Sequence, residues 1–408
     1  MKKEEEPRSK ERNPYLEYPG SPIVMGNFRD AIEAGKVTLL GDKIRLELPS
    51  GEPIVIPEKH QFNRVSQTLQ ELTEVIHEGS LLYREFDEDV LSRNGGSPYH
   101  QMIMHGNIVY YPEKEDVVFY ASPKWHKNAL ILRNSLLIRD PNQEISWRDQ
   151  RKVFDSLVIG VAGASVGKNA FMRIIDTMRP GWMKIADPKA YKDTNGNRAS
   201  LAYWEVGKNK AIVTAQQAHR NDPYINISVY PDGLTDLNMN DFVNGNEAKG
   251  EPALNYLIEE TDDPNRKIES LKWAKRHKIP FGMVTDIGTA YQVDFRDFKK
   301  TPDLPLMRGI EDEEILAIQQ RWQAGKGNAA LLLNFGMKLT GDNWEDVPEF
   351  RDLIMGKYQG TSREIPQLGV AANAGGSHLA VTLAKHALGA VIPERFFVDL
   401  ASRKIIEE

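Results

Sequence analysis

Apolar and polar positions follow two different rhythms along the chain, and the first one predicts a small mixed module. Apolar residues alternate with polar ones over 44–48 and again over 54–56, on either side of a Pro-Ser-Gly turn at 49–51. This alternation predicts a β-hairpin. From Phe62 to Ile76, apolar residues recur at helical spacing, which predicts an amphipathic helix. A hairpin followed by a helix indicates an α+β module of a winged-helix-like kind, whose role is either packing or substrate binding.

The second rhythm starts near Val153, where short apolar runs are separated by segments of helical length. The runs that predict strands are 157–161, 183–187, 226–230, 256–259 and 280–284. Strands that alternate with helices are typical of a parallel α/β sheet. We therefore expect a Rossmann-like, mostly parallel sheet, followed beyond Lys300 by a mostly helical part.

These patterns divide the chain into four segments. Residues 1–20 hold a dense mixture of charges with few apolar residues, and such a segment buries too little surface to order itself. We expect a disordered or docking tail at 1–20 and the α+β module at 21–125. The Rossmann-like sheet then occupies 126–300, and residues 301–408 form the C-terminal part of the same domain.

Composition narrows the class of protein. The chain has 408 residues, 52 basic and 58 acidic side chains, and no cysteine. The missing cysteine excludes disulfides, Cys-ligated zinc or iron–sulfur sites, and thiol nucleophiles. A net charge of −6 gives no electrostatic footprint for nucleic acid. Because no signal-like start and no apolar run of spanning length is visible, we expect a cytoplasmic protein with no nucleic-acid or membrane partner.

A glycine-rich turn lies between the first predicted strand of the sheet and a predicted helix. Gly160, Gly163 and Gly167 are spaced along it, and glycines in such a turn let backbone N–H groups approach a phosphate at a helix N-terminus. Asp187 ends the next predicted strand, where a carboxylate can bind ribose hydroxyls. The alternative is a tight turn without a ligand. The pair predicts a nucleotide site without saying which nucleotide, since a nicotinamide enzyme shares both features.

Four ordered motifs identify the kind of nucleotide site. They are Asp187 followed by Asn195-Gly196-Asn197-Arg198, the segment Val206–Ala211, the segment Glu260–Asp263, and the stretch from Leu368 to Gly389. Together they resemble the ubiquitin-activating-enzyme-like adenylyltransferases, a family that includes activators of thiamine and molybdopterin biosynthesis. The resemblance covers about residues 130–390 and implies an ATP-binding adenylation domain with a C-terminal capping and dimerisation part.

The resemblance also implies roles for individual residues. Asp187 would hold the ribose, Arg198 and Lys210 would contact the triphosphate, and Asp262 would bind Mg²⁺. Arg133 resembles an arginine that the family donates across a dimer interface. The remaining members of the implied nucleotide site are Gly160, Gly163, Gly167, Asn195 and Asn197. These residue types suit the chemistry, because cations offset the repulsion between an attacking carboxylate and the phosphates.

Each of these assignments has a plainer alternative. Arg198 and Lys210, taken singly, are typical of surface charges, and Asp262 is equally placed to cap the helix that follows it. The chain also departs from the family: alanines replace two usual glycines of the loop, Lys189 replaces a common second acid, and Asp263 replaces an asparagine. A nucleotide-binding pseudoenzyme or scaffold therefore stays open.

The absence of cysteine selects a branch of the family, because a chain without thiols cannot form its own thioester. The cysteine-free branch includes the maturation enzymes of microcin C and pantocin A, which modify ribosomally made peptides, and enzymes that cyclise a modified tRNA base. The N-terminal module is compatible with peptide recognition. We expect a homodimer that adenylates a precursor-peptide carboxylate for capture by an internal nucleophile in natural-product maturation. The alternatives are a tRNA-modifying dehydratase and an NAD-dependent oxidoreductase.

Overall fold

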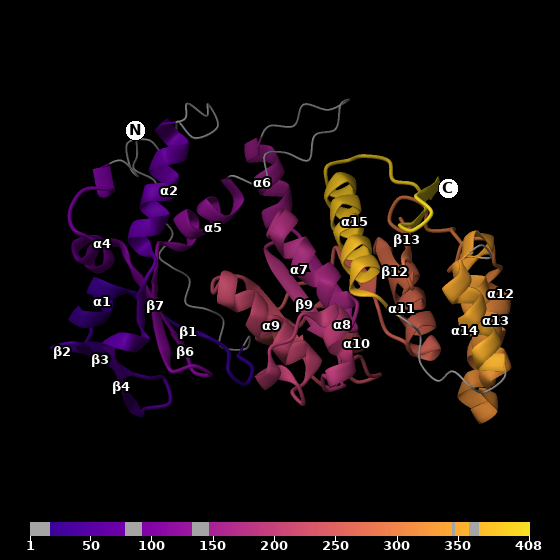
Figure 1. The fold of residues 1–408 in the computed structure, drawn as a ribbon, viewed down its shortest axis with the longest axis horizontal. Coiled ribbons are helices and arrows are strands. Elements are labelled where there is room, and N and C mark those ends of the chain that lie inside the picture. The colour runs from indigo at the N-terminus through magenta and orange to yellow at the C-terminus, as the bar shows by residue number, and fades with distance from the viewer. Residues whose placement is uncertain (1–16, 78–91, 133–146, 345–346, 359–366) are drawn as a thin grey trace. The chain divides into compact units, whose positions relative to one another are not determined.

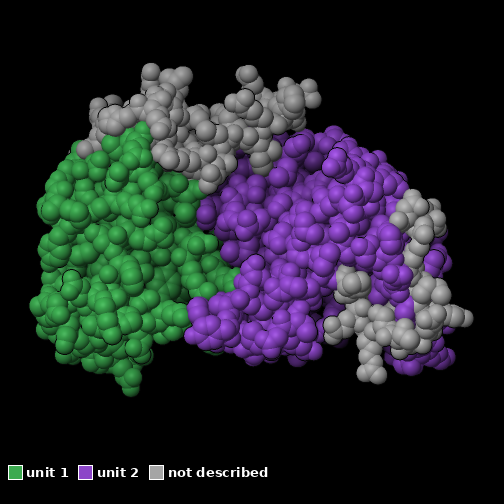
Figure 2. Space-filling view, in the orientation of Figure 1, with its two compact units in different colours: residues 1–137, 216–226 green, residues 138–215, 227–408 purple. Residues whose placement is uncertain are grey.

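The computed structural model describes residues 17–77, 92–132, 147–344, 347–358 and 367–408. The chain forms two compact units (Figure 2). The first contains residues 1–137 and 216–226, and the second contains residues 138–215 and 227–408. Each unit has its own sheets and core, and each is described separately below.

The first unit combines two small sheets with short helices. A four-stranded sheet has the order β1-β6-β7-β5, and a three-stranded antiparallel sheet has the order β2-β3-β4. The strands are β1 (Ile23–Asn27), β2 (Val37–Leu40), β3 (Lys43–Glu47), β4 (Pro53–Pro57), β5 (Gln61–Asn63), β6 (Asn107–Tyr111) and β7 (Asp116–Tyr120). The helices are α1 (Phe28–Glu33), α2 (Val65–His77), α4 (Pro98–His105) and α5 (Pro123–Leu132).

The predicted hairpin is confirmed as β3 and β4, which pair antiparallel from Glu47–Pro53 to Lys43–Pro57. The predicted helix is confirmed from Val65 onward, but its first apolar position is not helical. Phe62 lies in β5, opposite Val118 of β7. The spacing misled because a three-residue strand runs directly into the helix, so one apolar residue of the strand falls in phase with the helical repeat.

The second unit is built on an eight-stranded sheet with the order β10-β9-β8-β11-β12-β13-β14-β15. Strands β9, β8, β11 and β12 are parallel, whereas β12 to β15 are antiparallel. The bounds are β8 (Val158–Ala162), β9 (Trp182–Ala186), β10 (Asn226–Tyr230), β11 (Tyr256–Glu259), β12 (Phe281–Ile287), β13 (Ala290–Arg296), β14 (Arg395–Asp399) and β15 (Lys404–Glu407). The predicted Rossmann-like α/β fold and its five strands are therefore confirmed.

Helices cover both faces of this sheet (Figure 1). On one face, α7 packs along α15, which also contacts β12; residues of the other face share a core with helices α10 to α13. The helices of this unit are α6 (Trp147–Asp155), α7 (Gly167–Met178), α8 (Gly196–Ala199), α10 (Met239–Asn244), α11 (Pro264–Arg276), α12 (Asp312–Arg321), α13 (Ala329–Thr340), α14 (Pro348–Tyr358) and α15 (Gly369–Ala387). Helix α9 (Lys210–Asn221) begins within this unit's residues.

Small residues in α15 serve packing inside the chain. A Cβ at Gly375 would lie 2.5 Å from Val284 of β12, and a Cβ at Gly376 would lie 2.8 Å from the backbone nitrogen of Ala170 in α7. Glycine at both positions therefore lets α15 approach the sheet and α7 closely. Packing within one chain therefore accounts for these two glycines.

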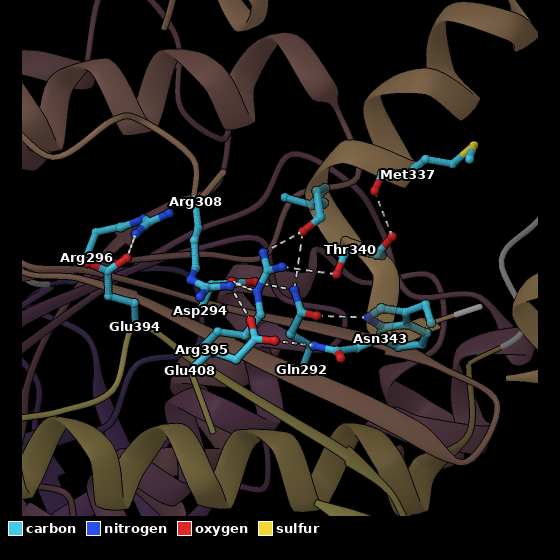
Figure 3. A network of polar contacts seen from close by, with 12 residues as sticks. Gln292, Asp294, Arg296, Arg308, Met337, Thr340, Asn343, Glu394, Arg395 and Glu408 are labelled. Carbon is cyan, nitrogen blue, oxygen red and sulfur yellow. Dashed lines mark hydrogen bonds and ion pairs between the residues drawn. The ribbon is translucent and has the colours of Figure 1, made fainter. Parts of the chain in front are cut away.

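Buried polar residues attach the C-terminal helices to the antiparallel half of the sheet (Figure 3). Arg395 of β14 donates to Asp294 of β13 at 2.7 Å and to the carbonyl oxygens of Leu339 and Thr340 at 3.0 and 3.2 Å. These carbonyls belong to the last turn of α13, whose backbone acceptors lack helical partners. The predicted mostly helical region beyond Lys300 thus also contains two strands.

Polar side chains explain why the sequence did not predict β13. Gln292, Asp294 and Arg296 occupy alternate positions of that strand, a pattern that suggests a solvated loop or edge. All three are buried, because Gln292 and Asp294 are hydrogen-bonded within this network and Arg296 pairs with Glu394. Within the described residues, no helix is both long enough and apolar enough to cross a membrane.

Candidate nucleotide site

The glycine loop leaves the end of β8 in a conformation that requires glycine. Gly163 has φ of +93°, and a Cβ there would lie 2.6 Å from the carbonyl carbon and oxygen of Glu260. A Cβ on Gly167, the first residue of α7, would lie 2.9 Å from the Glu260 Cβ. Both positions therefore need glycine to let the loop lie against the end of β11. The loop carries backbone N–H groups at a helix N-terminus, which is suited to an anion.

Gly160 belongs to the predicted strand 157–161 and not to the glycine turn that follows it. It lies inside β8, paired with Lys184 and Leu257 of the neighbouring strands. A Cβ there would lie 2.8 Å from the side chains of Phe242 and Leu254. Glycine at this position makes room for the core on that face of the sheet, so we leave Gly160 out of the phosphate-binding loop.

Asp187 follows β9 and fixes the shape of the loop beside it. Its Oδ2 accepts a hydrogen bond from the backbone N–H of Ala164 at 2.7 Å, and its Oδ1 accepts one from that of Lys189 at 2.8 Å. The side chain is buried. Each carboxylate oxygen has a further lone pair, so Asp187 can hold the loop and still accept a hydrogen bond from a ribose hydroxyl.

The Asn-Gly-Asn-Arg motif lies in a short helical segment next to the loop. The Arg198 Nε donates to the hydroxyl of Ser165 in the glycine loop at 3.1 Å, and Arg198 Nη1 donates to Asn197 Oδ1 at 2.9 Å. Asn197 in turn donates to the carbonyl oxygen of Gln367 at 2.7 Å. The buried Asn195 side chain accepts from the Lys192 N–H at 3.0 Å and shapes the turn. The structure therefore brings the arginine of the motif to the glycine loop.

Lys210, the first residue of α9, is largely buried. The residue is 7% exposed, and its Nζ lies 5.7 Å from the ring centroid of Tyr191. Among the described residues, this Nζ has no hydrogen bond and no ion pair. Burial lowers the pKa of Lys210, and the charges of Asp187 and Asp262 act against that shift. A lysine ammonium at this sheet edge, free of hydrogen bonds and ion pairs among the described residues, is suited to an anionic group of a ligand.

The two aspartates that follow β11, Asp262 and Asp263, make different contacts. Asp263 caps α11, because its Oδ1 accepts from the N–H groups of Asn265 and Arg266 at 2.9 and 3.4 Å. The capping alternative therefore applies to Asp263, and the carboxylate of Asp262 is left for other contacts. Lys189 donates to both oxygens of Asp262, at 2.7 and 2.9 Å.

A magnesium ion fits this site only together with nucleotide phosphates. In the parts of the chain that the structure describes, no three carboxylate or imidazole side chains are grouped to hold a metal. Magnesium is commonly bound by one or two carboxylates plus substrate phosphates. Asp262 meets that requirement as a single ligand, and Lys189 then has to release it.

Sheet topology explains why these residues meet. Gly163, Asp187 and Asp262 follow the carboxyl ends of β8, β9 and β11, which are parallel neighbours. In open parallel sheets, ligands bind at this edge. Lys210 and Arg198 join them at the same edge, as the interactions above show. Arg133 lies outside the described residues.

The structure adds two residues that the sequence did not assign to the site. Lys189 is one, through its ion pair with Asp262. The other is Asp286 near the end of β12, which is 3% exposed and accepts a hydrogen bond from the side-chain amide of Gln367 at 3.0 Å. Burial raises the pKa of Asp286 to about 7, although the charge of Arg198 opposes the shift. The available signal is an acidic residue two positions after the apolar run 280–284.

Comparisons with known proteins give distant matches. No family model matches the chain. Over 203 residues, 49% of this chain, it is 26% identical to the uncharacterized protein MT1398 of Mycobacterium tuberculosis (strain CDC 1551 / Oshkosh). The match spans 26% of that protein, so the chain corresponds to about a quarter of the length of this curated relative.

Several solved structures have a similar chain course at low sequence identity. PaaA is 13% identical with a TM-score of 0.47, covering 84% of this chain and 95% of PaaA. Escherichia coli MccB is 10% identical with a TM-score of 0.45, covering 91% of each chain. The E. coli tRNA N6-threonylcarbamoyladenosine dehydratase TcdA is 17% identical with a TM-score of 0.38, covering 59% of this chain and 90% of TcdA.

Both kinds of enzyme that the motifs resemble are thus among these structures, since MccB is a microcin C7 biosynthetic enzyme and TcdA is a tRNA dehydratase. At such TM-scores and identities, the matches support no conclusion about function.

Proposed function

We propose that the chain is an ATP-dependent enzyme of the ubiquitin-activating-enzyme-like adenylyltransferase family that activates a carboxylate. The observation that carries the proposal is the position of Lys210, which is 7% exposed, has no hydrogen bond or ion pair among the described residues and lies at the edge that also holds the glycine loop. A nucleotide triphosphate supplies a direct anionic partner for its ammonium group. Arg198, held beside the loop by Ser165, supplies a second positive charge.

The proposed first step needs no nucleophile from the protein. A carboxylate oxygen of the substrate attacks the α-phosphorus of ATP, the bond to the β-phosphate oxygen breaks, and pyrophosphate leaves with the electron pair. Arg198 and Lys210 offset the repulsion between the two anions and stabilise the charge of the transferring group. A bound Mg²⁺, held by Asp262 and the phosphates, would further neutralise the triphosphate.

In the second step, a nucleophile of the same substrate attacks the acyl carbon. The new bond forms as the bond from carbon to the adenylate oxygen breaks, and AMP leaves. The absence of cysteine from the chain excludes a thioester on this chain as an intermediate. Direct capture is therefore the step we propose, and positioning of the two groups supplies most of its rate.

A ribosomally made precursor peptide is the substrate we propose. The first unit supplies a separate α+β module with its own sheets, a suitable scaffold for holding a peptide. The motifs resemble the cysteine-free, peptide-modifying branch of the family, and this resemblance makes a peptide the first substrate to try. Dimerisation and a role for Arg133 from a second copy remain predictions of the motif resemblance.

ATP–pyrophosphate exchange tests the proposal. Purified protein is offered short peptides encoded beside its gene, and we expect exchange with one of them. Arg198→Ala and Asp262→Ala are expected to abolish exchange. Lys192→Ala is the matched control, because Lys192 is an exposed lysine close to the motif.

The outcomes separate the alternatives. Exchange driven by tRNA but by no peptide would replace the peptide with tRNA as substrate. Binding of ATP without exchange on either substrate would favour a scaffold or pseudoenzyme. If ATP does not bind at all, the proposed family is wrong.

A further inference from the structure

A buried carboxylate oxygen next to the proposed ATP site has no hydrogen-bond partner. Asp286 is 3% exposed, and its Oδ1 accepts from the Gln367 side chain at 3.0 Å. Its Oδ2 is fully buried and has no hydrogen bond to any described residue. Leaving a buried polar atom without a hydrogen bond is energetically unfavourable. Such an atom in a folded protein calls for an explanation, and a ligand is one.

The location of Asp286 connects it to the Asn-Gly-Asn-Arg motif. β12 lies parallel to β11 in the sheet, so Asp286 approaches the same edge as Asp262. Gln367 bonds Asp286 through its side chain and Asn197 through its carbonyl oxygen, at 3.0 and 2.7 Å. The Arg198 charge also acts on Asp286. One glutamine therefore joins the unsatisfied carboxylate to the segment that holds the arginine.

The surroundings of Asp286 disfavour a negative charge. Burial is the main cause of its raised pKa of about 7, and Arg198 is the cation whose charge opposes the shift. Asp286 also acts on the buried carboxyl of Glu260, whose pKa burial raises well above its usual value. Five other ionisable groups lie near Asp286 or near its end of β12. They are Arg198 of α8, Glu260 after β11, Tyr291 of β13, His378 of α15 and Glu349 of α14.

We propose that Asp286 binds the substrate carboxylate: with nucleotide bound, Asp286 is neutral, and its Oδ2–H donates a hydrogen bond to the carboxylate that is adenylated. This inference rests on the proposed function. The positive charge of Arg198 favours the ionised form of Asp286. When nucleotide phosphates bind Arg198, they neutralise that charge, and Asp286 then takes up a proton from solvent. A neutral donor beside Arg198 suits an anionic carboxylate, whereas an ionised Asp286 would repel it.

Proton uptake on nucleotide binding tests the first half of the inference without a substrate. The α,β-methylene analogue of ATP is titrated with Mg²⁺ into the full-length protein at pH 7, in two buffers of different ionisation enthalpy. If nucleotide raises the Asp286 pKa by one unit, about 0.4 proton is taken up per nucleotide. Asp286→Asn is expected to abolish that uptake. The control Asp303→Asn, which alters an exposed carboxylate of the same unit, is expected to retain it.

The second half of the inference is the hydrogen bond from Asp286 to the substrate carboxylate. It is tested with the peptide that supports ATP–pyrophosphate exchange. Asp286→Leu removes the donor and is expected to raise KM for the peptide about 10- to 100-fold, with a smaller change in kcat. Asp286→Asn keeps a neutral donor and is expected to rescue most of that loss. If Asp286→Asn is as impaired as Asp286→Leu, an ionised carboxylate is required and the inference is overturned.

Failure of the inference differs from failure of the proposed function. Nucleotide binding with equal proton uptake in wild type and Asp286→Asn overturns the role of Asp286 alone. Absence of nucleotide binding to the wild-type chain overturns both. Nucleotide binding by both Asp286 variants shows that they are folded.

Discussion

Lys189 Nζ lies 2.7 and 2.9 Å from the two carboxylate oxygens of Asp262. The ammonium group of Lys189 is therefore paired with the carboxylate that we propose as the metal ligand. Asp262 follows β11 and Lys189 follows β9, on either side of β8 in the sheet, and the two residues are 73 positions apart in the chain. Their side chains are 72% and 58% exposed, respectively. Because exposed ion pairs contribute at most about 1 kcal/mol, this pair competes with a metal without excluding it.

The first prediction concerns loss of the ion pair between Lys189 and Asp262, which competes with Mg²⁺ for the Asp262 carboxylate. Lys189→Ala is expected to lower the Mg²⁺ concentration that gives half-maximal binding of a non-hydrolysable ATP analogue by about two- to fivefold, as expected for an exposed pair. Calorimetric titration at several Mg²⁺ concentrations measures this value, with Lys192→Ala as the control. An increased Mg²⁺ requirement in Lys189→Ala would mean that Lys189 itself binds the nucleotide.

The second prediction is that substitution of Lys210 changes nucleotide affinity without lowering the stability of the fold. The residue is largely buried, its ammonium has no hydrogen bond or ion pair among the described residues, and burial lowers its pKa. Lys210→Met is therefore expected to leave the free energy of unfolding nearly unchanged, because no hydrogen bond or ion pair within the described chain is lost. Nucleotide affinity is expected to fall at least about tenfold, the loss of one charged hydrogen bond. Urea unfolding and nucleotide titration measure the two effects, and a loss of stability with unchanged affinity would contradict the assignment.

Gly163 provides a steric test of the loop. Gly163→Ala forces a Cβ to within 2.6 Å of the Glu260 carbonyl group, in a backbone conformation with φ of +93°. We expect a loss of about 1–3 kcal/mol in unfolding free energy together with loss of nucleotide binding. Gly196→Ala is the control, because nothing lies within 4 Å of a Cβ at that position. Equal behaviour of the two variants would show that the loop tolerates a side chain.

Asp286 makes stability depend on pH. Its pKa in the folded chain is about 7, above the usual 3.8. Between these values the unfolded state loses the proton and the folded state keeps it, so stability falls as pH rises from about 4 to 7. Asp286→Asn removes that dependence and is expected to be more stable than wild type by roughly 1–4 kcal/mol at pH 8, with little difference at pH 4. Urea unfolding at both pH values checks the difference, and a less stable Asp286→Asn at pH 8 would contradict the raised pKa.

Much of the fold was predictable from the sequence, because the parallel strands are buried on both faces and have continuous apolar runs. Strand β13 was not, since Gln292, Asp294 and Arg296 are buried through mutual polar contacts rather than through apolar burial. Pattern analysis has no means to recognise a buried polar strand, because the partners come from distant segments.

The candidate site, like the fold, was predictable from the sequence only in part. Motif order identified Arg198, Lys210 and Asp262. Asp262 reaches the sheet edge as the residue after β11, whereas Arg198 and Lys210 reach it from helices α8 and α9. Sequence spacing could not show that Lys189 binds Asp262 or that Gln367 joins Asp286 to Asn197. Such contacts depend on crossover connections and side-chain directions. Gly160 shows the reverse error, since a glycine inside a strand was assigned to the loop that follows it.

Isotope transfer from the substrate tests adenylation most directly. A peptide that supports ATP–pyrophosphate exchange is labelled with ¹⁸O in its carboxylates, and the nucleotide product is analysed by mass spectrometry after one turnover. Attack of the carboxylate on the α-phosphorus, followed by capture at the acyl carbon, predicts AMP that carries one ¹⁸O atom. ADP together with ¹⁸O-labelled inorganic phosphate would show phosphorylation instead and would contradict the account.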